Sequence, residues 1–566
     1  MVGMGPYVDG HVLSWIIFMP GATALFLLAI GAVLRGFFGS AGLPGEVWRA
    51  IALGSTGLTL LLASAGLFVA FEPETMGLQL VEYADWLPGY GVQYFVAVDG
   101  INLFPVLLVT LLVPLVLIAS WGRVERSLRS FVFFLLFLES AILGVFLSFN
   151  VLLFHLFWQL ALVAVYFIIG IWGGRERIAV ATKFLLHGGV GAMLMWVAIL
   201  VLFRLNLEAN GVPGLDLVTQ PGSPAPGLLE LAIPASESGL EWWRSQTWLF
   251  LAFAVAFATL LPLAPLHGWL PDALEEAPGE GAALIAGLLL QLGAYGLLRF
   301  AIPLFPEAAE SGAPLIRILA LVSIAYAGLR ALYAVDLKRV IAYLAMVQGG
   351  FIVLGLFSLE GLGQVGSVVG IVSRGLVLTA LVLLVGMLEE RRGTRRIDQF
   401  GGLARPMPIL ALLLGVAVFA GAGAPGSSAF VFELLALAAT FEVSARVGLA
   451  GCLGALAMAL CLYRIYRRVI LGPLEIEANR NLPDLNGQEA ALVLALLIPI
   501  LWIGLYPNPV LRRIEPSVLE VRSQILERGA LSLEAGAPRN SGPSGNSIRV
   551  TEDPGSPASA ASGGGR

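Results

Sequence analysis

The chain has 566 residues, of which 58% are hydrophobic and only 13% are charged, and its mean hydropathy is +0.88. Soluble domains are about half apolar and about one quarter charged, so this composition excludes a water-soluble globular fold and indicates a membrane protein. The formal net charge is −5 and no basic block occurs, which excludes the electrostatic footprint of a nucleic-acid-binding protein.

Long apolar runs predict an all-α polytopic membrane protein. A helix needs about 20 apolar residues to cross the hydrocarbon core, and only elements that satisfy their own backbone hydrogen bonds can span it. Fourteen runs meet this requirement. In chain order they cover residues 14–34, 48–70, 103–119, 131–147, 150–171, 181–203, 248–265, 281–302, 314–332, 337–357, 365–388, 408–435, 443–463 and 490–505.

The loops between these runs alternate in charge. Segment 71–102 contains five acidic residues and no Lys or Arg, whereas the next loop holds Arg123, Arg126 and Arg129. Arginine-rich loops are cytoplasmic by the positive-inside rule, so both termini are expected on the outer side. The tail 529–566 is rich in Gly, Ser, Pro and Ala, and we expect it to be disordered.

Two of the runs are interrupted. Pro262 and Pro265 break the seventh run, and Pro425 with its neighbouring glycines breaks the twelfth. Matched breaks in two halves are typical of an internal structural repeat, in which irregular backbone lines a cavity near the membrane midplane. An ordinary proline kink in each helix is the alternative interpretation.

Several short segments, in order along the chain, resemble the M-type antiporter-like subunit of bacterial respiratory complex I, the NADH:quinone oxidoreductase. They are VDGINLF (98–104), FHLFWQL (154–160), YFIIGIWGG (166–174), KFLLHG (183–188), PLHGWLPDA (265–273), EAP (276–278), YGLLRFAIPLFPEA (295–308), DLKRVIAY (336–343), TRRI (394–397), PGSSAFVFELL (425–435) and DLNGQE (484–489). The GIWGG, LFPEA and TRRI pieces favour the M-type over the sister L- and N-types.

This resemblance implies about fourteen transmembrane helices, with two inverted five-helix repeats that each contain a broken helix. Residues 1–130 then hold helices 1–3 and an acidic outer loop, 131–302 the first repeat, 314–468 the second repeat and 489–507 the final helix. The resemblance also implies a bacterial inner membrane location and L-, N- and K-type partner subunits. A hydrated polar axis moves protons in this family, and flavin, iron–sulfur clusters and quinone are expected in partner subunits, with no cofactor in this chain.

The chain departs from the family at most positions of the proton relay. The fifth-helix glutamate is replaced by Gln159, the seventh-helix lysine by Leu260, the eighth-helix lysine by Gln291, the tenth-helix histidine by Gln348 and the eleventh-helix histidine by Arg374, while the twelfth-helix acid is kept as Glu433. Losing one partner of a buried ion pair costs about 3–5 kcal/mol, whereas losing both can be neutral. Because glutamine holds water without titrating, we expect an impaired or rerouted proton path.

Other polar residues are candidates for a rerouted path. His155 and Gln159 are four residues apart on one helix, as are Lys183 and His187 on the next, so each pair shares a helix face. One interpretation is a relocated relay, in which imidazoles that titrate near neutral pH replace the lost groups. The alternative is that these are interior histidines whose hydrogen bonds are satisfied.

Further polar residues are candidates for roles in or near the path. Arg374 opposite Glu433 is expected to form a static ion pair, because a guanidinium is a good counter-ion and a poor proton carrier. Glu139 is either a coupling group or hydrogen-bonded to a neighbouring helix. His267 matches the family at the cytoplasmic exit of the broken helix and is a candidate for proton entry. Arg299 matches too, and near a span end it is expected to snorkel.

Three functional hypotheses follow. The first is a membrane-arm subunit of complex I or a complex I-like assembly that translocates protons. The second is a non-pumping structural paralogue of the M subunit. The third is a subunit of a cation/proton antiporter, a membrane hydrogenase or an inorganic-carbon uptake complex. The two cysteines, Cys452 and Cys461, lack the spacing of a metal site or a disulfide framework, and no residue is expected to bind metal or act as a catalytic group.

Overall fold

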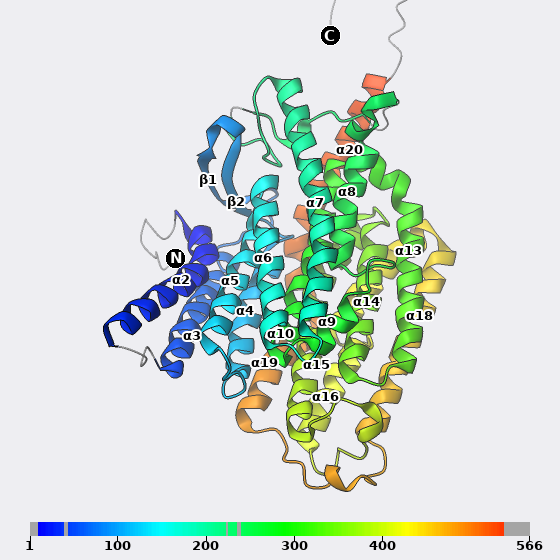
Figure 1. Ribbon diagram of the computed structural model, residues 1–566. Helices are drawn as coiled ribbons and strands as arrows, with labels where there is room; N and C mark the ends of the chain where they lie inside the picture. The colour runs from blue at the N-terminus through cyan, green and yellow to red at the C-terminus, as the bar shows by residue number, and fades with distance from the viewer. Residues whose placement is uncertain (1–9, 39–43, 222, 224, 235–238, 537–566) are drawn as a thin grey trace, which may run out of the picture.

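The apolar runs fold as a bundle of long helices (Figure 1). The computed structural model describes residues 10–38, 44–221, 223, 225–234 and 239–536. Within them, eleven helices are long and apolar enough to cross a membrane, and three shorter apolar helices accompany them. Together these match the fourteen predicted spans one by one.

The first part of the chain contains three spans and a β-hairpin. The spans are α2 (Val12–Phe38), α3 (Gly45–Leu61) continued by the π-helical η2 (Leu62–Phe68), and α4 (Leu103–Ala119). The predicted acidic loop forms the antiparallel strands β1 (Gln79–Leu87) and β2 (Val92–Val98), joined by the 3-10 turn η3 (Pro88–Tyr90). The sequence predicted an acidic outer loop here, and the structure adds that this loop is folded as a hairpin. Glu82 of β1 accepts a hydrogen bond from the backbone N–H of Leu13 (2.6 Å) at the start of α2, where a carboxylate is favourable.

The middle part of the chain contains the next five spans. Asn150 caps α6 by accepting from the backbone N–H groups of Leu152 and Leu153. The elements are α5 (Leu128–Leu147), α6 (Val151–Trp172), α7 (Arg177–Asn210), the 3-10 turns η4 (Leu228–Glu230) and η5 (Gly239–Arg244), α8 (Gln246–Leu260), α9 (Leu270–Glu276), and a segmented eighth span made of α10 (Gly279–Leu284), η6 (Ile285–Leu289), α11 (Leu290–Gly296), η7 (Leu297–Ala301) and α12 (Ile302–Leu304). Both η6 and η7 are π-helical.

The last part contains six spans and a final helix. Asp336 caps α14 and Asn486 forms a capping box with Glu489 at the start of α19. The elements are α13 (Pro306–Tyr333), α14 (Leu337–Leu356), α15 (Gly361–Arg392), η8 (Ile397–Gln399), α16 (Pro408–Gly421), α17 (Ser428–Val443), α18 (Ala445–Val469), η9 (Glu477–Asn479), α19 (Gly487–Leu505) and α20 (Asn508–Gly536).

Helix α20 was not among the predicted elements, and it corrects the predicted tail. Its apolar side chains Val510, Ile514 and Val518 are buried, and Ser517 accepts from the backbone N–H of Gly100 (2.8 Å). The helix continues to Gly536, so the predicted disordered segment is helical where it begins at Gly529. The remainder of that segment, residues 537–566, lies outside the described residues.

The bundle has two distinct ends (Figure 1). We call the end with β1, β2 and α20 the hairpin face, and the opposite end, where Arg123, Lys338, Arg391 and Arg395 lie, the arginine-rich face. Every residue is buried in the most apolar 18-residue stretch of the eighth span and of α15, and 94% of the corresponding stretch of α14 is buried. These three spans therefore carry the residues that are shielded from lipid.

Candidate functional site

Both predicted helix breaks are present. Helix α8 ends at Leu260 and α9 begins at Leu270. Between them the backbone N–H of Ala264 donates to Ser323 Oγ (2.8 Å), and Trp269 Nε1 donates to the carbonyl of Thr259 (2.9 Å). Backbone groups freed by the prolines are thus satisfied by neighbouring protein, as irregular backbone at membrane depth requires.

The second break separates α16 from α17, and Glu433 lies against it. Gly423 has φ +64° and Gly426 has φ +93°, conformations that glycine adopts without steric cost. A Cβ atom on Gly423 would overlap the Glu433 carboxylate, so the glycine makes room for the acid. Helix α8 starts at the hairpin face and α16 at the arginine-rich face (Figure 1), so the broken helices enter from opposite ends, as inverted repeats require.

Three of the positions predicted to match the family's relay lie close together inside the bundle. The guanidinium of Arg374 donates to the carbonyl of Leu290 (3.4 Å), the residue before Gln291. A Cβ atom on Gly349, the residue after Gln348, would lie 3.4 Å from Arg374 Nη2. Gln291, Gln348 and Arg374 are all 0% exposed. The eighth span, α14 and α15 therefore bring these positions together.

The predicted Arg374–Glu433 ion pair is absent from the described residues. Arg374 contacts the carbonyl of Leu290 instead, and no salt bridge joins it to Glu433 in this part of the chain. The prediction was wrong because Arg374 lies beside the break of the seventh span, where a Cβ on Gly349 would approach both Leu261 O and the guanidinium. Glu433 lies beside the break of the twelfth span.

Several buried polar atoms in the bundle have no protein partner. They include both carboxylate oxygens of Glu139, both amide atoms of Gln348, Oε1 of Gln291, and Nε and Nη2 of Arg374. Natural proteins rarely leave such atoms unsatisfied, and buried water supplies the missing hydrogen bonds where sites are polar. The unpartnered atoms of Gln291, Gln348 and Arg374 lie on the three most buried spans, where bound water would form a hydrated axis, and those of Glu139 lie on α5. Because neither Glu139 oxygen has a protein partner, the interpretation that Glu139 is hydrogen-bonded to a neighbouring helix is removed.

His155 and Gln159 are brought together as predicted. Their side chains lie 3.2 Å apart, Nε2 to Nε2, and the His155 ring packs 5.1 Å from Trp196 of α7. His155 is 3% exposed and its Nδ1 has no protein partner. This histidine is thus not a fully satisfied interior residue, which keeps it as a proton-path candidate.

Lys183 and His187 lie elsewhere on α7. Trp196 is thirteen residues beyond Lys183, which corresponds to about 20 Å along a helix, so the lysine is far from His155. Lys183 Nζ pairs with Asp272 Oδ2 (2.7 Å), and His187 Nδ1 contacts the carbonyl of Lys183 (2.8 Å). The structure therefore separates the two predicted pairs rather than joining them into one relay.

His267 and Asp272 flank the first break as expected. The His267 ring lies 4.6 Å from the Tyr326 ring and its Nδ1 has no protein partner. Asp272 accepts from Lys183 and also from Arg339 (3.2 Å). A carboxylate held by two cations is a structural anchor between α7, α9 and α14, while the half-buried imidazole has an unpartnered Nδ1.

Arg299 does not snorkel, which corrects a prediction. Its Nη2 lies 2.6 Å from both carboxylate oxygens of Asp99, and the two side chains are 3% and 4% exposed. The guanidinium also packs over the ring of Phe149, 4.8 Å from its centroid. The partner was missed because Asp99 is two hundred residues away in sequence and sat in the segment predicted to be an outer loop.

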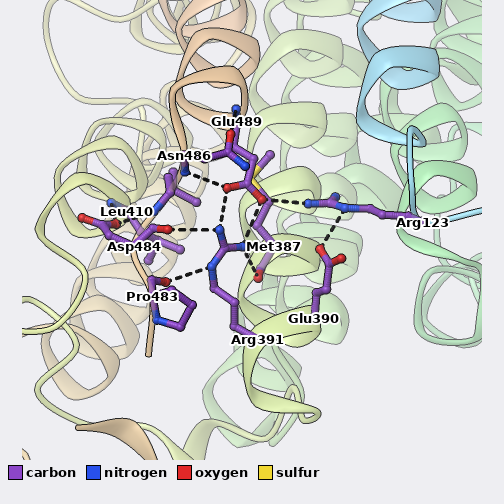
Figure 2. Close-up of polar contacts among 10 residues, drawn as sticks. Arg123, Met387, Glu390, Arg391, Leu410, Pro483, Asp484, Asn486 and Glu489 are labelled. Atoms are coloured by element: carbon purple, nitrogen blue, oxygen red, sulfur yellow. Dashed lines mark hydrogen bonds and ion pairs between the residues drawn. The ribbon is translucent and has the colours of Figure 1, made fainter. Parts of the chain in front are cut away.

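An ion cluster on the arginine-rich face was also missed (Figure 2). Glu489 of α19 accepts from Arg123 Nη2 and from Arg391 Nη1, each at 3.1 Å. Arg123 Nε also pairs with Glu390 Oε2 (2.8 Å). The cluster joins the ends of α4 and α15 to the start of α19. Sequence alone indicated only that these loops carry arginines and that DLNGQE begins a helix.

Two broken helices that enter from opposite ends, around a buried polar axis, define a polytopic membrane subunit of the antiporter type. The family described as NADH:quinone oxidoreductase/Mrp antiporter, TM, matches residues 148–458. The chain therefore belongs to this family. The predicted resemblance and fold class are confirmed.

Individual relatives cover most of the chain. It is 36% identical over 513 residues to NADH-quinone oxidoreductase subunit M of Rhodobacter capsulatus, covering 90% of this chain and 96% of that one. It is 34% identical to NADH-ubiquinone oxidoreductase chain 4 of Arabidopsis thaliana, covering 81% and 89%. A chain in the structure of respiratory complex I from Thermus thermophilus with bound NADH is 29% identical, with a TM-score of 0.75, and covers 90% of this chain and 100% of that one.

A more distant structure shares the fold alone. In the Mrp complex from Dietzia sp. DQ12-45-1b, one chain matches with a TM-score of 0.75 at 17% identity, covering 93% of this chain and 99% of that one.

Proposed function

We propose that this chain is the M-type subunit of the membrane arm of a proton-translocating NADH:quinone oxidoreductase. The relatives named subunit M support this, because the Rhodobacter capsulatus protein matches over 96% of its own length. L-, N- and K-type subunits are the expected neighbours. Among the described residues, no group of three or more His, Cys, Asp or Glu side chains is placed to hold a metal ion, and we infer that the redox groups belong to partner subunits.

The single observation that carries a proton-conducting role is the set of buried polar atoms without protein partners on the central spans. Ionisable groups inside a membrane are costly and therefore indicate function. Glu139, His155 and Glu433 can each bind and release a proton. Gln291 and Gln348 cannot titrate, but their amides can hold water between these groups. We infer that protons follow this rerouted axis.

A second candidate function is a non-pumping structural paralogue, which two observations favour. Leu260 occupies the end of α8 with 1% exposure and offers neither a charge nor a hydrogen bond. Arg374 holds a permanent charge at the centre of the axis, where an additional proton would be repelled. Both features oppose conduction through the first half of the bundle.

Proton counting in vesicles that contain the parent complex separates these functions. With a rerouted path, we expect fewer protons per NADH than in a complex with the full relay, and a further fall on Glu433→Gln or Glu139→Gln. Glu310→Gln, at an exposed position of α13, is the matched control. A low ratio that neither buried substitution changes would favour the non-pumping paralogue, and a normal ratio that neither changes would defeat both ideas.

We also propose that the arginine-rich face is cytoplasmic in a bacterial inner membrane and that both termini lie outside, in line with the positive-inside rule. In a chain whose two cysteines are replaced by serine, a membrane-impermeant maleimide applied to spheroplasts should label Thr75→Cys on the hairpin face. It should label Thr394→Cys on the arginine-rich face only after lysis. The reverse pattern would overturn this orientation.

A further inference from the structure

A cavity of about 680 Å³ opens on the arginine-rich face where the three parts of the chain meet. It is lined by Arg123 after α4, by Glu280 of α10, by Lys338 of α14, and by Glu389 and Arg395 at the end of α15. Two of its lining residues, Arg123 and Glu390, form the ion pair drawn in Figure 2. A cavity of this size and polarity holds many water molecules.

Most charged side chains that line this cavity are engaged. Lys338 pairs with Glu389 (3.3 Å) and donates to the carbonyl of Ala277 (3.1 Å). Arg395 pairs with Glu389 (3.2 Å) and with Asp336 (3.0 Å). Glu275 pairs with Arg339, Glu276 accepts from the backbone N–H of Glu176 (3.0 Å), and Glu390 pairs with Arg123. Arg175 is exposed.

Glu280 is the exception. It is 5% exposed and lines the cavity, yet among the described residues no other side chain forms a hydrogen bond or salt bridge with its carboxylate. Burial and Glu390 oppose the charged form of Glu280, whereas a hydrogen bond from its own backbone stabilises that form, as do Arg123 and Lys338 from a distance. A buried carboxylate that is not locked to a cation can exist with or without its proton, which is what a proton carrier requires.

The position of Glu280 connects the cavity to the central axis. Glu280 lies in the first turn of the eighth span, and Gln291 lies eleven residues further along the same span, which is about 16 Å deeper. This span is buried throughout its most apolar 18-residue stretch. It includes the π-helical η6 between the two residues, an irregularity that often occurs at functional sites.

We propose that Glu280 is the proton-accepting group at the floor of this cavity and passes protons taken from bulk water toward Gln291 and the central axis. This inference rests on the proposed function, because it supplies an entrance to the same path. The step is a proton transfer alone: a water O–H bond breaks and a carboxyl O–H bond forms, and the reverse exchange delivers the proton to water deeper in the span.

The test uses the intact complex and two independent measurements. Infrared difference spectra over a pH series should contain a carboxyl band that is lost in Glu280→Gln and kept in Glu310→Gln. In vesicles, Glu280→Gln should lower protons per NADH to the same extent as Glu433→Gln, whereas Glu310→Gln should leave this ratio unchanged. Glu280→Asp, which keeps a titratable group, should restore most of the ratio and should also retain a shifted infrared band.

The outcomes distinguish this inference from the proposed function. If Glu433→Gln lowers the ratio and Glu280→Gln does not, the entrance is elsewhere and the inference is overturned while the proposed function stands. If neither changes the ratio, the proposed function fails and the inference fails with it. If Glu280→Gln prevents assembly, a Glu280→Asp complex whose carboxyl band does not shift overturns the role of Glu280.

Discussion

Replacing Asp99 with Asn should destabilise the protein more than replacing Arg299 with Met. The two side chains form a buried ion pair with both carboxylate oxygens 2.6 Å from Arg299 Nη2. Asp99 Oδ1 additionally accepts from the backbone N–H groups of Ile101 (2.9 Å) and Asn102 (3.1 Å). The carboxylate therefore keeps two hydrogen bonds when the arginine is removed.

Arg299 keeps fewer favourable contacts after the loss of Asp99 than Asp99 keeps after the loss of Arg299. Without Asp99, it keeps ring contacts with Phe149 (4.8 Å) and Tyr295 (5.7 Å), each of which contributes about 0.5–2 kcal/mol. Breaking a buried pair costs about 3–5 kcal/mol, and we place Asp99→Asn in this range. Arg299→Met should cost roughly 2–3 kcal/mol, since hydrogen bonds to a charged group each contribute about 1.5–3 kcal/mol.

A double-mutant cycle measures this coupling. Unfolding by sodium dodecyl sulfate in dodecyl maltoside micelles, followed by tryptophan fluorescence, gives the free energy for the wild type, both single variants and the double variant. The double variant should be destabilised by clearly less than the sum of the single variants, because no stranded charge remains. Additivity within about 0.5 kcal/mol, or a larger loss for Arg299→Met, would refute the reasoning.

Three further predictions concern the two faces and the second break. Burial raises the pKa of Asp216, in the loop between α7 and α8, from 3.8 to about 6, so the folded state binds more protons than the unfolded state in that range. The free energy of unfolding should therefore fall by roughly 2–3 kcal/mol as pH rises through this range. In thermal unfolding, Asp216→Asn should reduce the pH dependence of stability, and an unchanged pH dependence would contradict this prediction. Glu489→Gln should cost about 1–3 kcal/mol, because it weakens bonds to two arginines, and a neutral effect in the same denaturation assay would show that the cluster contributes little. Gly423→Ala should lower the free energy of unfolding by at least about 1–2 kcal/mol because of its left-handed backbone, and it should displace Glu433 and lower the proton yield. The control Gly54→Ala, in open space on α3, should be neutral or stabilising. Equal effects of the two substitutions would contradict the proposed clash.

The membrane spans and both helix breaks were predictable from sequence, for a local reason. Lipid forces every backbone group in a span to be satisfied within its own helix, so apolar run length alone locates the helices. Pro262 and Pro425 then mark where the helical ladder cannot continue. The β-hairpin and α20 were not predicted because each packs on protein rather than lipid and neither contains a long apolar run.

The composition of the candidate site was predictable, but its pairing was not. The motif matches placed Gln291, Gln348 and Arg374 on neighbouring spans, and the structure brings them together. No sequence pattern indicated that Lys183 pairs with Asp272. Such pairs join residues many positions apart, and their formation depends on how the helices rotate about their own axes.

Taken by itself, the sequence predicted a membrane protein with fourteen apolar runs, two interrupted helices and substitutions at most positions that match the family's proton relay. Only the tertiary structure decided which charged side chains form ion pairs with one another. In the described part of the chain, Arg299 pairs with Asp99, Arg374 forms no salt bridge with Glu433, and no other side chain pairs with Glu280 in its polar cavity. The physical reason is that the length of an apolar run is a local property of the sequence, whereas ion pairing and burial depend on distances between separate helices.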